Sequence, residues 1–147
     1  MTASASPSVP VSWGELLDKI TILEIKCARI IQPEARANVA REYALLRDIA
    51  AEVMRRQGVA SLLEELKAVN EDLWNIEDRI REKESEAQFG PDFIGLARSV
   101  YKRNDRRAAL KRAINLRLSS DLVEEKSYTA NTPASFADDP SAALIHG

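Results

Sequence analysis

The sequence predicts an all-α protein, an antiparallel helical bundle of four long helices arranged as two helical hairpins. Apolar residues recur at alternating spacings of four and three in several long segments, which is the spacing of a packed helical seam. Five Gly and six Pro are few for 147 residues and favour long helices over a sheet-rich fold. The breaks between these segments are short, roughly two to five residues, and short breaks make neighbouring helices antiparallel.

The first predicted helix follows Ser12, which forms a capping box with Glu15 three residues later. Its main seam consists of Leu16, Ile20, Leu23, Cys27 and Ile30. Ile22 and Ile25 point away from this seam, so the helix is apolar on more than one face. Such a helix is either central in a bundle or covered by another chain.

The remaining three helices are marked by their punctuation. Pro33 suits the first position of a second helix, which runs to about Gln57 and ends at Gly58 as a C-cap. The third helix covers residues 61–87, and Ser61 with Glu64 predicts a capping box at its start. Its seam is Leu62, Leu66, Val69, Leu73, Ile76 and Ile80. A fourth helix follows the break at residues 88–92 and extends to about Leu118.

The bundle domain is expected to span residues 12–128, with a disordered arm at 1–11 and a disordered tail at 129–147. Both ends are rich in small and polar residues, with Pro among them, which cannot bury enough apolar surface to order themselves. The segment 121–128 (DLVEEKSY) is interpreted as a short ordered piece or a docking tail.

Composition excludes several classes of function. A formal net charge of −2 gives no reason to expect nucleic acid or an anionic membrane as partner. No apolar run is long enough to span a bilayer, and the first residues do not form a secretory signal. The one cysteine, Cys27, cannot form an intrachain disulfide and fits a reducing compartment, so a cytoplasmic location is expected. The one histidine, His146, falls in the predicted tail, which leaves no His-based triad or zinc site.

Charge is divided between the last two helices. Residues 61–87 carry nine acidic and four basic side chains, whereas residues 98–118 carry eight basic side chains and one acid. A basic helix can bind nucleic acid. The favoured interpretation is electrostatic pairing of the two helices within their hairpin, because only Tyr101 is available in the basic stretch to stack on a base.

The hairpin geometry also predicts a polar layer. With the turn centred near Gly90-Pro91, Glu77 faces Asn104 and Asn70 faces Lys111. Polar side chains that flank the apolar seams then converge on the bundle interior. The candidate binding residues are Glu24, Asn70, Trp74, Glu77, Asp78, Arg98, Asn104, Asp105 and Lys111. Two interpretations stay open: a register lock of buried polar groups, or a pocket for a sugar-nucleotide or other anionic ligand with Trp74 as an apolar wall.

Enzymatic chemistry would have to rest on carboxylates. Glu15 and Asp18 are three residues apart on one helix face, and helical bundles can bind magnesium through such pairs. The pair is similar to the E-x-x-D half of the all-α nucleotide pyrophosphohydrolases, but the E-x-x-E half is missing. No metal site is expected on the main interpretation, and Mg²⁺ enters only with the enzymatic alternative.

Four strings of the sequence resemble a family of small bacterial proteins of unknown function, over about residues 12–128. They are GELLDKITILEIK (14–26), VNEDLWNIEDRIREKE (69–84), FIGLARSVYKRNDRRAALKRAIN (93–115) and LVEEKSY (122–128). The resemblance implies an all-helical protein that occurs beside or fused to cell-surface polysaccharide and tetratricopeptide-type proteins, and hence a role near glycan synthesis. It implies no mechanism.

These observations favour a non-catalytic helical interaction or scaffold module, which binds a protein partner or associates with itself as a homodimer. The alternative is a small-ligand-binding protein or metal-dependent enzyme that uses the polar layer between the third and fourth helices.

Overall fold

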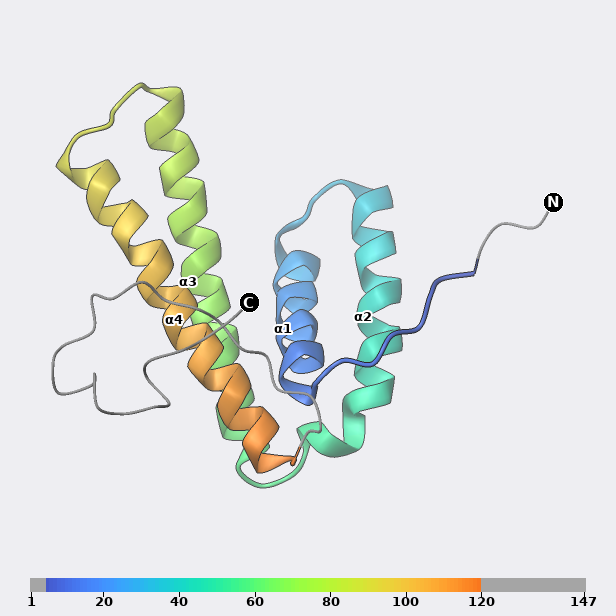
Figure 1. The fold of residues 1–147 in the computed structure, drawn as a ribbon. Coiled ribbons are helices and arrows are strands. Elements are labelled where there is room, and N and C mark those ends of the chain that lie inside the picture. The colour runs from blue at the N-terminus through green and yellow to red at the C-terminus, as the bar shows by residue number, and fades with distance from the viewer. Residues whose placement is uncertain (1–4, 120–147) are drawn as a thin grey trace, which may run out of the picture.

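The computed structural model describes residues 5–119, and it confirms the all-α fold (Figure 1). Its four helices are α1 (Trp13–Arg29), α2 (Pro33–Met54), α3 (Val59–Ser85) and α4 (Pro91–Arg117). Residues 5–10 are exposed and have no regular secondary structure. The predicted docking segment 121–128 and the predicted tail 129–147 lie outside the described residues, as do residues 1–4 of the predicted disordered N-terminal segment.

Helix α1 is the central helix of the bundle. The Ser12 side chain accepts a hydrogen bond from the Glu15 amide at 3.1 Å, so the predicted N-cap is confirmed. Helix α1 packs against α2, α3 and α4, and both of its apolar faces are covered. Ile20 on the main seam and Ile25 off it are 1% and 3% exposed. The second apolar face is therefore explained by the chain's own helices.

The junction between α2 and α3 differs from the prediction. Helix α2 ends at Met54, and Gly58 is the N-cap of α3 rather than the C-cap of α2. Its φ of 87° lies in the left-handed region, which glycine adopts without steric cost. Helix α3 consequently begins two residues before Ser61, and the predicted Ser61–Glu64 capping box is wrong because both residues lie inside the helix.

Helices α3 and α4 form the second hairpin, and their opposite charges meet as predicted. Three ion pairs join them: Arg106–Glu65 at 3.0 Å, Arg103–Asp72 at 3.6 Å and Lys83–Asp92 at 3.7 Å.

The predicted register of this hairpin is wrong. It would place Asp72 opposite Ala109, whereas the structure pairs Asp72 with Arg103. The connection spans residues 86–90, with Ala87 in the left-handed conformation at φ 53°. The turn is therefore centred near Gln88 rather than at Gly90-Pro91, which shifts every facing pair.

The hydrophobic core lies at one end of the bundle, where α1 and α3 begin and α2 and α4 end. Its buried members are Leu17, Ile20, Ala50, Val53, Val59, Leu66, Val69, Leu73, Leu110 and Ile114. At the other end the α3–α4 hairpin extends past the end of α1 (Figure 1). Among residues 5–119, no helix is both long and apolar enough to cross a membrane.

Candidate functional site

A buried carboxylate on α1 is the centre of the polar layer. Asp18 is 1% exposed and directly follows Leu17, a residue of the hydrophobic core. Arg107 on α4 donates two hydrogen bonds to it, Nε to Oδ1 at 2.8 Å and Nη2 to Oδ2 at 2.5 Å. This two-point contact matches the planar guanidinium to the planar carboxylate and compensates the cost of burying both charges.

Helix α3 joins the same centre through Asn70, which is 5% exposed. Its Nδ2 donates to Asp18 Oδ1 at 3.0 Å and to Thr21 Oγ1 at 2.8 Å. The Thr21 hydroxyl in turn donates to the backbone carbonyl of Asp18 at 2.7 Å. One carboxylate therefore links α1, α3 and α4.

Two further contacts continue the layer along α1 and α4. Lys111 Nζ donates to Glu15 Oε2 at 2.7 Å, and the Gly14 amide donates to Asn115 Oδ1 at 2.7 Å. The helices approach closely here, since a Cβ on Gly14 would lie 2.4 Å from the backbone oxygen of Lys111. Glycine at this position allows the two antiparallel helices to dock.

The polar groups of the layer satisfy one another. In the part of the chain that the structure describes, no buried side-chain nitrogen or oxygen lacks a hydrogen-bond partner. Closed networks of this kind fix the alignment of helices, because any slip would leave buried groups without partners. The layer therefore has the geometry of a register lock.

The carboxylates considered for magnesium lie within this network. Asp18 and Glu15 do share one face of α1, and each is bound by a cationic side chain of α4. Across residues 5–119 no group of three or more His, Cys, Asp and Glu side chains is arranged to hold a metal ion.

The predicted site residues fall into separate places. Asn70 and Lys111 are in the layer, and Glu24 pairs with Lys67 at 3.1 Å beside it. Trp74 is half-buried, with the guanidinium carbon of Arg29 5.8 Å from its ring centroid. Exposed positions on the α3–α4 hairpin hold Glu77, Asp78, Arg98 and Asp105, while Asn104 is half-buried there. The structure does not bring these residues into one site.

Sequence reasoning missed the residues that organise the layer. Asp18 was considered only as a magnesium ligand, Arg107 only as part of a basic face, and Thr21 not at all. The available signal was the spacing of Asp18 and Thr21, which are three positions apart on the apolar helix α1. Buried polar side chains have to find hydrogen-bond partners, and neighbouring helices can supply them.

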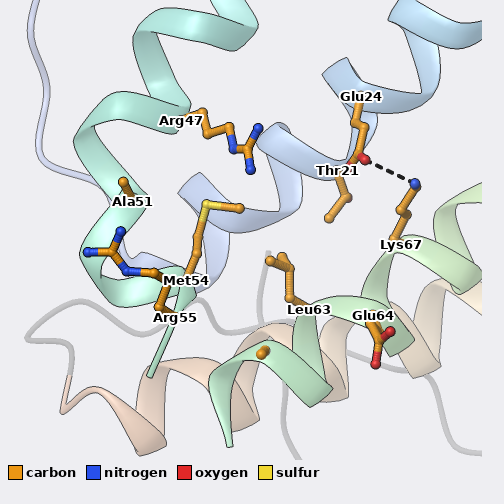
Figure 2. Close-up of a pocket in the computed structure, with 10 residues that line it drawn as sticks. Thr21, Glu24, Arg47, Ala51, Met54, Arg55, Leu63, Glu64 and Lys67 are labelled. Atoms are coloured by element: carbon orange, nitrogen blue, oxygen red, sulfur yellow. Dashed lines mark hydrogen bonds and ion pairs between the residues drawn. The ribbon is translucent and has the colours of Figure 1, made fainter. Parts of the chain in front are cut away.

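A cavity of about 390 Å³ lies between α1, α2 and α3, on the side of α3 away from α4. We call it the groove (Figure 2). Its lining residues are Thr21, Glu24, Arg47, Ala51, Met54, Arg55, Ala60, Leu63, Glu64 and Lys67. The hydrogen bond to Glu24 raises the pKa of Lys67, so this lysine is firmly protonated.

The fold and the polar layer define the class of protein. It is an all-α protein of two helical hairpins, in which a buried carboxylate on the central helix α1 accepts hydrogen bonds from α3 and α4. The chain belongs to a family of unknown function, DUF6165, whose match covers residues 8–144. Searches of the curated proteins and of the solved structures gave no match.

Proposed function

We propose that the protein is a non-catalytic helical interaction module that associates with a second copy of itself. The contact surface is the part of the α3–α4 hairpin beyond the end of α1, namely residues 76–85 and 91–99, which we call the arm. Arg29, the last residue of α1, contacts Trp74 and Asn75 of α3. The arm begins directly after these contacts and projects from the rest of the bundle (Figure 1).

An apolar face of the arm carries the proposal. Helix α1 contacts α4 at Arg107, Lys111 and Asn115. Because seven residues make two turns, positions seven and fourteen residues earlier continue the same face. On the arm these positions are Phe93 and Ala97, with Ile94 beside them; Val100 and Tyr101 follow at the level of the end of α1, where Val100 packs against the core. The face that α1 covers lower down therefore stays apolar where α1 no longer reaches.

These side chains are incompletely covered. Tyr101 is 55% exposed and Ile94 47%, while Phe93 and Val100 are half-buried. Single exposed apolar residues are ordinary on a protein surface, but a continuous stripe along one helix face is typical of an interaction site.

Charge supports a second copy as the occupant. Arg98 lies beside the apolar stripe on α4, and Glu77 and Glu84 lie on α3. None of these three has an ion-pair partner among residues 5–119. A two-fold pairing of arms would place the cations of each copy near the anions of the other and complete a four-helix bundle.

Light scattering after size exclusion tests the proposal on the full chain. The wild type is expected to run at twice the chain mass. Ile94→Glu should run as a monomer, because it places a charge directly beside the apolar stripe. Leu45→Glu on α2 is the matched control, since Leu45 is 64% exposed but lies outside the arm.

Circular dichroism should show equal helicity for the three proteins, so that loss of association is not loss of folding. A monomeric wild type at high concentration would overturn the proposal. Equal loss of mass in Ile94→Glu and Leu45→Glu would show that the arm is not the contact surface.

The small-ligand or enzymatic alternative and the role near polysaccharide synthesis stay predictions. The closed hydrogen bonding of the polar layer favours a structural role for Asn70 and Lys111 over ligand binding.

A further inference from the structure

Within the described residues, other helices cover two sides of α4, and a third side faces outward. Arg103 and Arg106 pair with acids of α3, whereas Arg107 and Lys111 pair with acids of α1. The remaining side, which we call the outward face, repeats at the four-three spacing of a helical seam. Its members are Ile94, Arg98, Tyr101, Asp105 and Ala108.

The outward face is open to a partner. Tyr101 is 55% exposed and Ile94 47%, and Arg98 and Asp105 are also exposed. Neither of these two charged residues has an ion-pair partner among residues 5–119. Both are predicted binding residues that lie outside the polar layer. The face therefore offers an aromatic ring and two opposite charges that the described chain does not use.

The order of these groups makes the face complementary to itself. Arg98 and Asp105 are seven residues apart, which separates them by about 10 Å along the helix, too far to neutralise each other. Tyr101 lies between them. A patch with a cation at one end, a ring in the middle and an anion at the other end matches a second copy of itself turned end over end.

We infer that two copies associate through the outward faces of their α4 helices, which run antiparallel with the two-fold axis at Tyr101. Arg98 of each copy then lies opposite Asp105 of the other, and the two Tyr101 rings meet at the axis. Ile94 lies against Ala108 and Ala109, whose small side chains allow the helices to approach closely.

This inference rests on the proposed self-association and adds its direction and the surface that receives the arm. In the antiparallel arrangement, residues 91–99 of each copy lie along residues 104–112 of the other. Parallel α4 helices would instead place Arg98 against Arg98 and Asp105 against Asp105, and such like-charge contacts are repulsive. A second copy is the occupant because the same three residues, Arg98, Tyr101 and Asp105, supply both halves of the contact.

Charge reversal in the full chain tests the inference, with the dimer dissociation constant measured by sedimentation equilibrium. Arg98→Asp and Asp105→Arg should each raise this constant at least about tenfold, because each dimer would contain two like-charge pairs. An equimolar mixture of the two variants should associate as tightly as the wild type, since one copy then carries only acids and the other only bases at these positions.

Arg36→Asp is the matched control, because Arg36 is exposed on α2 and its reversal changes the net charge equally. It should keep the wild-type dissociation constant, and circular dichroism should show equal helicity for all variants. Arg98→Asp and Asp105→Arg variants that dimerise as tightly as the wild type would overturn the inference while leaving the proposed self-association in place. A monomeric wild type would overturn both.

Disulfide trapping reports the direction independently. Cys27→Ser removes the one cysteine of the chain. In that background, Tyr101→Cys should cross-link two copies on oxidation, because the two positions meet at the axis. Gln88→Cys should not, because antiparallel arms hold their tips about 40 Å apart. Efficient cross-linking of Gln88→Cys would show parallel arms and contradict the inference.

Discussion

Asp18 and Arg107 are 89 residues apart in the chain and form a two-point ion pair in the interior, with both oxygens of the carboxylate engaged. The Asp18 side chain is 2% exposed and the Arg107 side chain 29%. Asn70 adds a third donor from another helix. This pair therefore fixes how α1 sits between the two helices of the second hairpin.

Removal of the Asp18 carboxylate should take away the acceptor of two hydrogen bonds from the partly buried Arg107 side chain. Asp18→Ala is expected to lower the free energy of unfolding by about 3–5 kcal/mol. Urea denaturation followed by circular dichroism measures it. Asp48→Ala is the matched control, since Asp48 is an exposed acid on α2 and should cost less than about 0.5 kcal/mol. A loss below 1 kcal/mol for Asp18→Ala would argue against a locking role.

The two interpretations of the polar layer differ at Asn70 and Glu77. Asn70→Ala removes two hydrogen bonds inside the core and should cost about 1–3 kcal/mol of unfolding free energy. Glu77→Gln changes an exposed side chain and should stay within about 0.5 kcal/mol. Thermal and urea unfolding of both variants provide the comparison. Equal stability of the two would indicate that the layer is not structural.

Replacement of two helical glycines by alanine should change the stability of the protein in opposite directions. Gly14→Ala places a methyl group 2.4 Å from the Lys111 carbonyl oxygen, so the α1–α4 contact has to open, at a cost of about 1–3 kcal/mol or more. Gly95→Ala meets no atom within 4 Å and should stabilise α4 by about 0.5–1 kcal/mol. Melting temperatures of both variants test the pair. A neutral Gly14→Ala would mean that the helices are not closely docked at this point.

Much of the fold could be predicted because its signals are local. The Ser12 cap, the Pro33 start and the apolar seams each depend on residues within a few turns. The start of α3 was missed because the left-handed Gly58 can end one helix or precede the next, and the sequence does not distinguish these cases.

The candidate site was less accessible because its partners are distant in sequence. A small error in the centre of the α3–α4 turn moved every predicted facing pair, so Glu77 and Asn104 were placed in the interior. Asn70 and Lys111, which were expected beside the apolar seams and facing the interior, are both buried. Arg107 could be assigned to Asp18 only once the packing of α1 on α4 was known.

Hydrogen exchange at two protein concentrations tests most directly whether the arm is the contact surface. Self-association through the arm should slow amide exchange in residues 76–85 and 92–99 as the concentration rises. Exchange in residues 36–48 of α2 should not change and serves as the reference within the same molecule. Concentration-independent exchange in the arm, or slowing confined to α2, would contradict the proposed function.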